Sequence, residues 1–148
     1  MVRFIAAPLV LFAFAVARSD IRTRRVPNRL TFTAAAAGCA VNSCMAGCRG
    51  WLLSLAGMGL GVAVLIVPFA LGWIGGGDLK SLAALGSIGG PRFALVAFLL
   101  GSVAAGLWAA ALLLAALRYR RPAPTIPYAA FMCLAAAATL LSPLAGIR

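Results

Sequence analysis

The sequence predicts an all-α integral membrane protein: a six-helix transmembrane bundle with a short fourth helix and both termini outside. Hydrophobic residues make up 64% of the 148 positions, and charged residues make up only 10%. An ordinary soluble domain is roughly 45–50% apolar and about 25% charged. The few charges also fall in short stretches between long apolar runs. A water-soluble fold is therefore not expected, and residues 1–148 are predicted to form one polytopic membrane domain.

Six apolar segments mark the expected helices. In chain order they are approximately Phe4–Ala17, Leu30–Gly47, Trp51–Ile74, Leu79–Ile88, Phe93–Leu117 and Ile126–Leu141. A membrane-spanning helix needs about 20 apolar residues, and the third and fifth segments meet this requirement easily. The fourth segment is short, so we expect a half-depth or partly solvated helix that starts directly from the turn Gly75–Asp78.

The positive charges predict the orientation of these segments. Nine of the thirteen Lys and Arg residues follow segments one, three and five: Arg18, Arg22, Arg24, Arg25, Arg29, Lys80, Arg118, Arg120 and Arg121. The opposite side holds Arg3, Arg49, Arg92 and Arg148. Cytoplasmic loops carry the excess of Lys and Arg, so both termini are expected outside. The same asymmetry argues that the first segment is retained as a span, although it imitates a cleavable signal peptide.

Small residues predict close helix packing inside the bundle. The spacing G-x-x-x-G occurs at Gly57 and Gly61 in the third segment and at Gly86 and Gly90 in the fourth. Lipid provides no hydrophobic drive for helix association, so helices rely on small residues that let backbones approach. This pattern predicts structure and says little about function.

Two kinds of binding site are not expected. A net charge of +11 could indicate nucleic acid, but the charges lie in the short loops in which membrane proteins place Lys and Arg. The four cysteines form no C-x-x-C pair, and the chain has no His. A zinc site is therefore poorly supported, and neither a metal nor a cofactor is predicted.

The chain contains only two acidic residues, Asp20 and Asp78. Each follows a long apolar run, and two spans separate them, so both are expected on the same side of the bilayer. Acids near or within the membrane are costly and usually mark a function. Two carboxyl groups that share a proton can hydrolyse an amide: one takes a proton from water, and the other hydrogen-bonds the carbonyl oxygen. No Ser or Cys can have a His partner, so a catalytic triad is not available.

Each acid also has a purely structural interpretation. Asp20 could offset the neighbouring arginines in a solvated loop. Asp78 could act as the N-cap of the helix that follows it. An N-cap role does not explain three successive glycines, Gly75, Gly76 and Gly77, which remove side chains and let another backbone approach closely.

The stretch D-x-R-x-R-R-x-P-N that begins at Asp20, combined with the G-x-G-D box at Gly75–Asp78, resembles the prepilin peptidase family. These are bacterial intramembrane aspartyl proteases that remove leader peptides from type IV pilin precursors. The resemblance implies that Asp20 and Asp78 are the catalytic pair. It also implies that Gly75 and Gly77 shape the approach of the substrate backbone, and Gly76 is included in the predicted substrate-binding turn. Lys80 is predicted either to pair with an acidic residue early in the mature pilin or to be a snorkelling lysine at the membrane interface. Ala129 and Ala130 stand where many relatives have another proline, which leaves the role of the sixth segment open.

The resemblance also implies a substrate and a location. The chain has no room for the cytoplasmic methyltransferase domain of longer family members and lacks its C-x-x-C pairs. It resembles the short, peptidase-only members associated with Flp-type pili of tight-adherence systems. The expected partners are the lipid bilayer and a membrane-inserted prepilin helix with a cytoplasmic leader. The expected location is the bacterial cytoplasmic (inner) membrane, as a multi-pass protein.

Two other function classes compete with a protease. One is a small membrane transporter or proton-relay subunit that uses Asp20 and Asp78, since intramembrane carboxylates serve such relays. Relay acids tend to lie in mid-span, whereas both of these acids fall at segment ends. The other is a non-catalytic membrane scaffold that uses its small-residue helices as interfaces.

Overall fold

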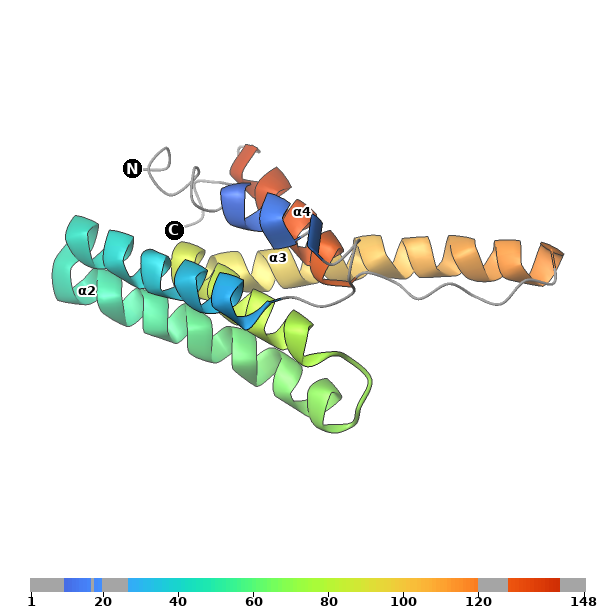
Figure 1. The fold of residues 1–148 in the computed structure, drawn as a ribbon, viewed down its shortest axis with the longest axis horizontal. Coiled ribbons are helices and arrows are strands. Elements are labelled where there is room, and N and C mark those ends of the chain that lie inside the picture. The colour runs from blue at the N-terminus through green and yellow to red at the C-terminus, as the bar shows by residue number, and fades with distance from the viewer. Residues whose placement is uncertain (1–9, 17, 20–26, 120–127, 142–148) are drawn as a thin grey trace.

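A computed structural model describes residues 10–16, 18–19, 27–119 and 128–141. Residues 10–16 and 18–19 are helical, and three further helices follow: α2 (Asn28–Ala70), α3 (Gly76–Tyr119) and α4 (Tyr128–Leu141). Strands are absent from these described ranges. The prediction of an all-α protein is therefore confirmed for them (Figure 1).

The expectation of six separate helices is corrected by the structure. Four helical elements form the described part of the chain, because the expected loops inside α2 and α3 are reduced to breaks of one or two residues. The break in α2 is at Ala46 and Gly47, and the break in α3 is at Gly90. Gly47 (φ 57°) and Gly90 (φ 83°) adopt positive φ, which glycine tolerates without steric cost. Pro91 follows Gly90 directly, and its fixed φ suits the first residue of the renewed helix.

Each break reverses the chain, so α2 and α3 are helical hairpins (Figure 1). We call residues 28–45 and 48–70 the first and second arms of α2. Residues 76–89 and 91–119 are the first and second arms of α3.

The first arm of α3 packs against both arms of α2. It runs parallel to the first arm of α2, because two cross-links join residues that are both 52 positions apart. In one, Lys80 Nζ donates to Asn28 Oδ1 at 2.9 Å. In the other, Ser87 Oγ donates to the Ala35 carbonyl at 3.1 Å.

The second arm of α2 runs antiparallel to the first arm of α3, and the two G-x-x-x-G motifs meet there. A Cβ placed on Gly57 would overlap the backbone carbonyl of Gly86, and a Cβ on Gly86 would overlap that of Gly57. A Cβ on Gly61 would lie 2.8 Å from the carbonyl oxygen of Leu82. The prediction of close packing through small residues is therefore confirmed.

The first arm of α3 is the centre of the hydrophobic core. Every residue from 81 to 88 is buried, so the expectation of a partly solvated fourth helix is wrong. Its side chains Leu82, Leu85 and Ile88 join one cluster with Val16 of the N-terminal helical residues and Met132 of α4. At 1.5 Å per residue the arm is about 21 Å long, shorter than the roughly 30 Å hydrocarbon layer.

Helix α4 packs on the second arm of α3. A Cβ on Gly101 would lie 2.8 Å from the Cα of Met132, and the rings of Trp108 and Phe131 have centroids 6.2 Å apart. Figure 1 shows the later part of α3 extending away from α2 and α4.

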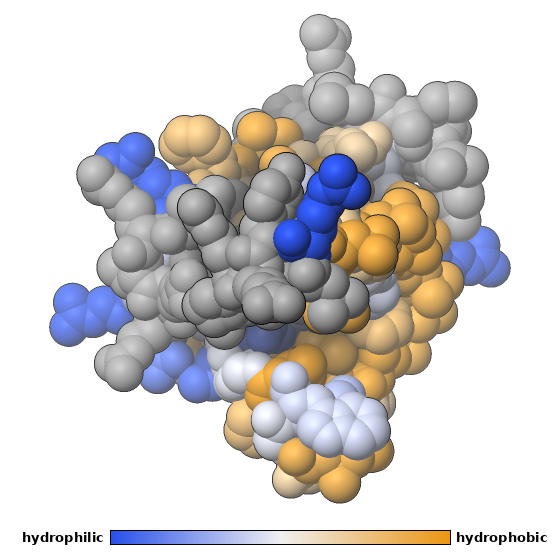
Figure 2. Space-filling model, turned by 90° about the vertical axis from the view of Figure 1, so that its right-hand side faces the viewer, coloured by the Kyte–Doolittle hydropathy of each residue, from blue (hydrophilic) through white to orange (hydrophobic). Residues whose placement is uncertain are grey.

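The surface is that of a membrane protein. Helix α2 and residues 76–115 of α3 are both long and apolar enough to cross a membrane, yet only 22% and 17% of their apolar windows are buried. Figure 2 shows one face of the molecule, and hydrophobic residues cover much of the described surface there. Soluble monomers rarely expose large contiguous apolar patches, so lipid is the solvent that suits these helices.

Candidate active site

Asp78 lies in the first turn of α3 and is half-buried. Its backbone N–H donates to the Gly75 carbonyl at 3.1 Å, and the Gly75 N–H donates to Asp78 Oδ2 at 3.3 Å. Because the helix already begins at Gly76, Gly75 occupies the cap position and Asp78 is the third helical residue. The interpretation of Asp78 as the N-cap is therefore wrong. Its carboxylate instead reaches back to the cap residue, as the acidic member of a capping box does.

Asp78 is recessed from the end of α2. The contacts Gly57–Gly86 and Gly61–Leu82 set an antiparallel register in which Asp78 lies level with Leu65. Helix α2 continues from there to Ala70, which adds about 8 Å at 1.5 Å per residue. The exposed residues 71–73 lie beyond that end. The carboxylate is therefore recessed relative to the second arm of α2, whereas the Lys80–Asn28 contact places it level with the start of the first arm.

Polar groups of the first helical turn lie beside the Asp78 carboxylate. The unpaired N–H groups of that turn carry a partial positive charge, and the Gly75 N–H donates a hydrogen bond to the carboxylate. Lys80 lies on the same helix, two residues further on.

The glycines beside Asp78 are not required by the described fold. A Cβ on Gly75 would make an ordinary contact with Asp78 Oδ2 at 3.6 Å, and one on Gly76 would lie 3.4 Å from the Phe69 ring. Neither glycine has a positive φ. The conformation and the packing described here would therefore tolerate a side chain at both positions.

Lys80 connects the two sequence motifs. Its Nζ donates to the side chain of Asn28 at 2.9 Å, and Asn28 is the last residue of the D-x-R-x-R-R-x-P-N stretch. The last residue of the first motif therefore contacts Lys80, which follows Asp78 by two positions in the second motif. Asp20 itself lies outside the described residues, so the structure describes one member of the predicted acid pair. Ser19, which directly precedes Asp20, is half-buried.

The Lys80–Asn28 hydrogen bond makes a testable contribution to stability. Lys80→Met and Asn28→Ala should each lower the free energy of unfolding by about 0.5–1 kcal/mol, the usual net value of one hydrogen bond. The double variant should lose little more than either single variant, because both changes remove the same bond. Denaturant unfolding of the purified protein in detergent measures these values. Arg29→Ala, a change at an exposed neighbour, is the control, and fully additive losses would contradict the prediction.

The sequence did not indicate that Tyr128 and Ser102 are in contact. The hydroxyl oxygens of these two side chains are 2.5 Å apart, which connects the start of α4 to the middle of α3. The charge of Asp78 also acts on the Tyr128 hydroxyl, after the larger effects of burial and of the hydrogen bond with Ser102. The only available signal was a tyrosine at the beginning of an apolar segment, directly after Pro127.

No group of three or more His, Cys, Asp or Glu side chains that could hold a metal ion occurs among the residues described by the structure. Among the cysteines, Cys133 is buried, whereas Cys44 and Cys48 are exposed. The described site therefore consists of a carboxylate, a lysine, two hydroxyl groups and bare glycine backbone.

Comparison with known proteins identifies a similar family. The model of the type IV leader peptidase family matches residues 7–110. This range includes both acidic positions, the three successive glycines and Lys80. No curated protein and no solved structure matches the chain.

Proposed function

The chain belongs to the type IV leader peptidase family, and from this premise we propose that it is an intramembrane aspartyl endopeptidase. Its proposed substrates are type IV prepilins of the Flp-like class, from which it removes the leader peptide. Cleavage takes place on the cytoplasmic side of the bacterial inner membrane, after the Gly that ends the leader. Asp20 and Asp78 are the proposed catalytic pair.

The observation that carries this proposal is the setting of Asp78. A half-buried carboxylate lies at the start of a buried helix, beside the second arm of α2 and next to two glycines, Gly75 and Gly76, that the described fold does not need. A structural acid would not need this bare backbone. A protease needs it, because its substrate chain must lie against the enzyme backbone beside the acid.

The proposed chemistry uses two carboxyl groups that share one proton. Like charges close together resist double ionisation, so one member of such a pair remains protonated. The ionised member takes a proton from water while the water oxygen attacks the carbonyl carbon of the scissile amide. The protonated member hydrogen-bonds the carbonyl oxygen and then gives its proton to the departing amine. The products are a new carboxyl terminus on the leader and a new amino terminus on the pilin.

The apolar surface beside Asp78 suits a membrane-inserted substrate. Ile66, Val67 and Phe69 on the second arm of α2 are 45%, 61% and 43% exposed, at the same end of the bundle as Asp78. We propose that the prepilin helix packs beside this arm and the first arm of α3. Its leader segment would extend over the glycines toward the acid.

Lys80 has two proposed roles, which substrate kinetics separate. If Lys80 binds an acidic residue of the mature pilin, Lys80→Met should raise KM while Asn28→Ala leaves KM unchanged. If Lys80 only holds the start of α2 against α3, both variants should have the same kinetic effect, since both lose the same bond.

The proposed orientation follows from the positive charges. The four arms, the N-terminal helical residues and α4 would together provide six membrane segments, with both termini outside. Arg49 and Arg92 then lie near the outer surface and Lys80 near the inner one.

Incubation of the purified protein with a candidate prepilin in detergent or lipid tests the proposed function. The expected result is a mass loss equal to that of the leader, with a new amino terminus on the pilin. Proteoliposomes that hold the same protein provide the control for a proton-relay function. Proton flux that depends on Asp78, without any cleavage of prepilin, would favour the relay over the protease.

A further inference from the structure

A cavity of about 380 Å³ lies at the end of the bundle opposite to Asp78. The chain reversal of α2 forms one wall of this cavity, and the chain reversal of α3 forms the other. The first arm of α3 connects the two ends: Asp78 lies at its start, and Ile88 contributes to the cavity about 15 Å further along the helix axis. Small-molecule sites have volumes of roughly 300–1,000 Å³, so this cavity is large enough to bind a ligand.

The cavity carries positive charge. Arg49 lines it from the α2 reversal and Arg92 from the α3 reversal, and both side chains are exposed. None of its lining residues is acidic, and Asp78 lies at the other end of the bundle. An anionic group from outside the chain would therefore complement the two guanidinium groups.

The floor of the cavity is built by a buried polar network. The Nδ2 atom of Asn42 donates to Ser54 Oγ at 2.8 Å, to the Ser87 carbonyl at 3.0 Å and to the Ile88 carbonyl at 3.1 Å. These bonds join three arms, and they satisfy carbonyl groups at the C-terminal end of the first arm of α3. The partial negative charge of those carbonyls would otherwise oppose an anion. The floor is thus fixed in place and does not repel a negative ligand.

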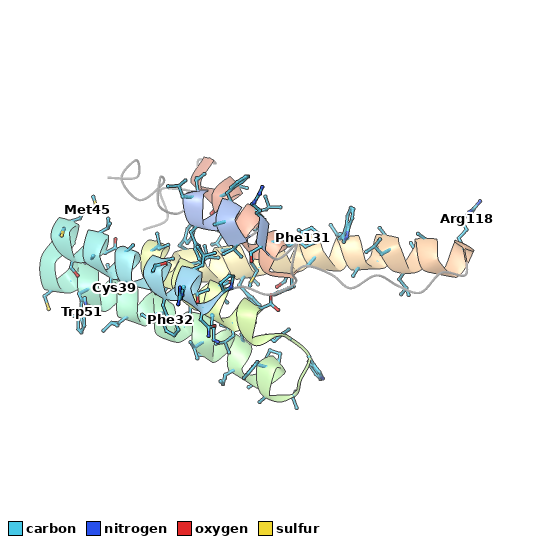
Figure 3. All side chains as sticks on the ribbon, in the orientation of Figure 1. Phe32, Cys39, Met45, Trp51, Arg118 and Phe131 are labelled. Atoms are coloured by element: carbon cyan, nitrogen blue, oxygen red, sulfur yellow. The ribbon has the colours of Figure 1, made fainter. Side chains whose placement is uncertain are left out.

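We propose that this cavity binds the phosphate group of an anionic phospholipid, from the leaflet opposite to the active site. A guanidinium matches the geometry of a phosphate and forms two parallel hydrogen bonds with it. Met45 and Leu53 also line the cavity, and the exposed side chain of Trp51 lies nearby, at the same end of α2 (Figure 3). These apolar groups suit the glycerol and acyl portions of a lipid. The site is separate from the proposed catalytic residues and does not depend on their activity.

Lipid titration of the full-length protein in zwitterionic detergent tests this proposal. Phosphatidylglycerol should bind about 30-fold more tightly than phosphatidylcholine, the effect expected of two basic residues that meet an anionic lipid. Native mass spectrometry measures the occupancy of each lipid, and a rise in the melting temperature with phosphatidylglycerol alone provides a second readout that needs no variant. Equal binding of the two lipids would overturn the proposal.

Charge variants locate the site. The double variant Arg49→Gln, Arg92→Gln should lose the preference for phosphatidylglycerol. Arg118→Gln removes the same kind of charge at the far end of α3 from Met45 and Trp51 (Figure 3), and it should keep that preference. An unchanged preference in the double variant would overturn the proposal. Displacement of the lipid by inorganic phosphate at equal concentration would also overturn it, in favour of a site for a soluble anion.

Discussion

Asp78→Asn is expected to lower the rate of leader cleavage by at least about 10³-fold, because an amide cannot accept the proton that general base catalysis transfers. The fold should survive this substitution. The Asn side chain keeps the size of Asp, and its oxygen still accepts the hydrogen bond that the Gly75 N–H donates in the native protein. The loss would therefore report chemistry rather than a damaged turn. Mass spectrometry of a purified prepilin after timed incubation with the variant measures the rate.

Two further variants complete this experiment. Asp20→Asn should cause a loss of similar size, since both carboxyl groups of a dyad are needed to move the shared proton. Ser81→Ala is the matched control, because Ser81 Oγ donates to the Gly77 carbonyl at 2.8 Å in the same helical turn and lacks a group that titrates near neutral pH. Its effect on the cleavage rate should stay below about 10-fold, the value of one hydrogen bond. Full processing of prepilin by either Asp variant would refute the catalytic assignment.

Gly57→Ala is expected to cost about 3 kcal/mol of stability, at the upper end of the usual penalty for overpacking. The added methyl group would overlap the backbone carbonyl of Gly86, and a backbone atom cannot rotate away as a side chain can. The second arm of α2 would have to separate from the first arm of α3. Because that first arm begins with the turn that holds Asp78, cleavage activity should fall together with stability.

Gly59→Ala provides a close control for this prediction. Gly59 lies two positions away on the same arm and is exposed, and a methyl group added to it would meet no neighbouring atom within 4 Å. Alanine is favoured over glycine in a helix by up to about 1 kcal/mol, so this variant should be as stable as the native protein or slightly more stable. Thermal unfolding in detergent compares the two variants. Equal melting temperatures for both would show that the Gly57–Gly86 contact is looser than the structure indicates.

Much of the fold could be predicted because the positions of the helical segments depend on local composition. Each of the two long helices contains two of the expected apolar segments, with the break at or close to the glycine that separates them. Burial of the first arm of α3 could not be predicted. Its eight buried residues include serines and a glycine, and a short, small-residue segment reads equally well as a solvated helix. The placement of α2 along two of its sides, with the N-terminal helical residues and α4 in the same core cluster, removes it from solvent and lipid.

The candidate site divides in the same way. Asp78 and its glycines stood out in the sequence because acids are so scarce in this chain. The contribution of Asn28 could not be recognised in the sequence, because a Pro-Asn pair before a helix is fully explained as a helix boundary. Its contact with Lys80 joins residues 52 positions apart. Such a contact depends on the parallel register of two arms, which the sequence of neither arm specifies.

By itself the sequence determined the helical class and the apolar segments, and it singled out the two acids. Each of these depends on the free energy of transferring individual residues between water and lipid. The tertiary structure alone decided which arms touch, where Asp78 lies along the neighbouring arms, and that Arg49 and Arg92 share one cavity. Those features depend on the fit of one helix surface against another. In lipid, where apolar surfaces gain nothing by meeting, that fit comes from backbone contacts such as Gly57 against Gly86.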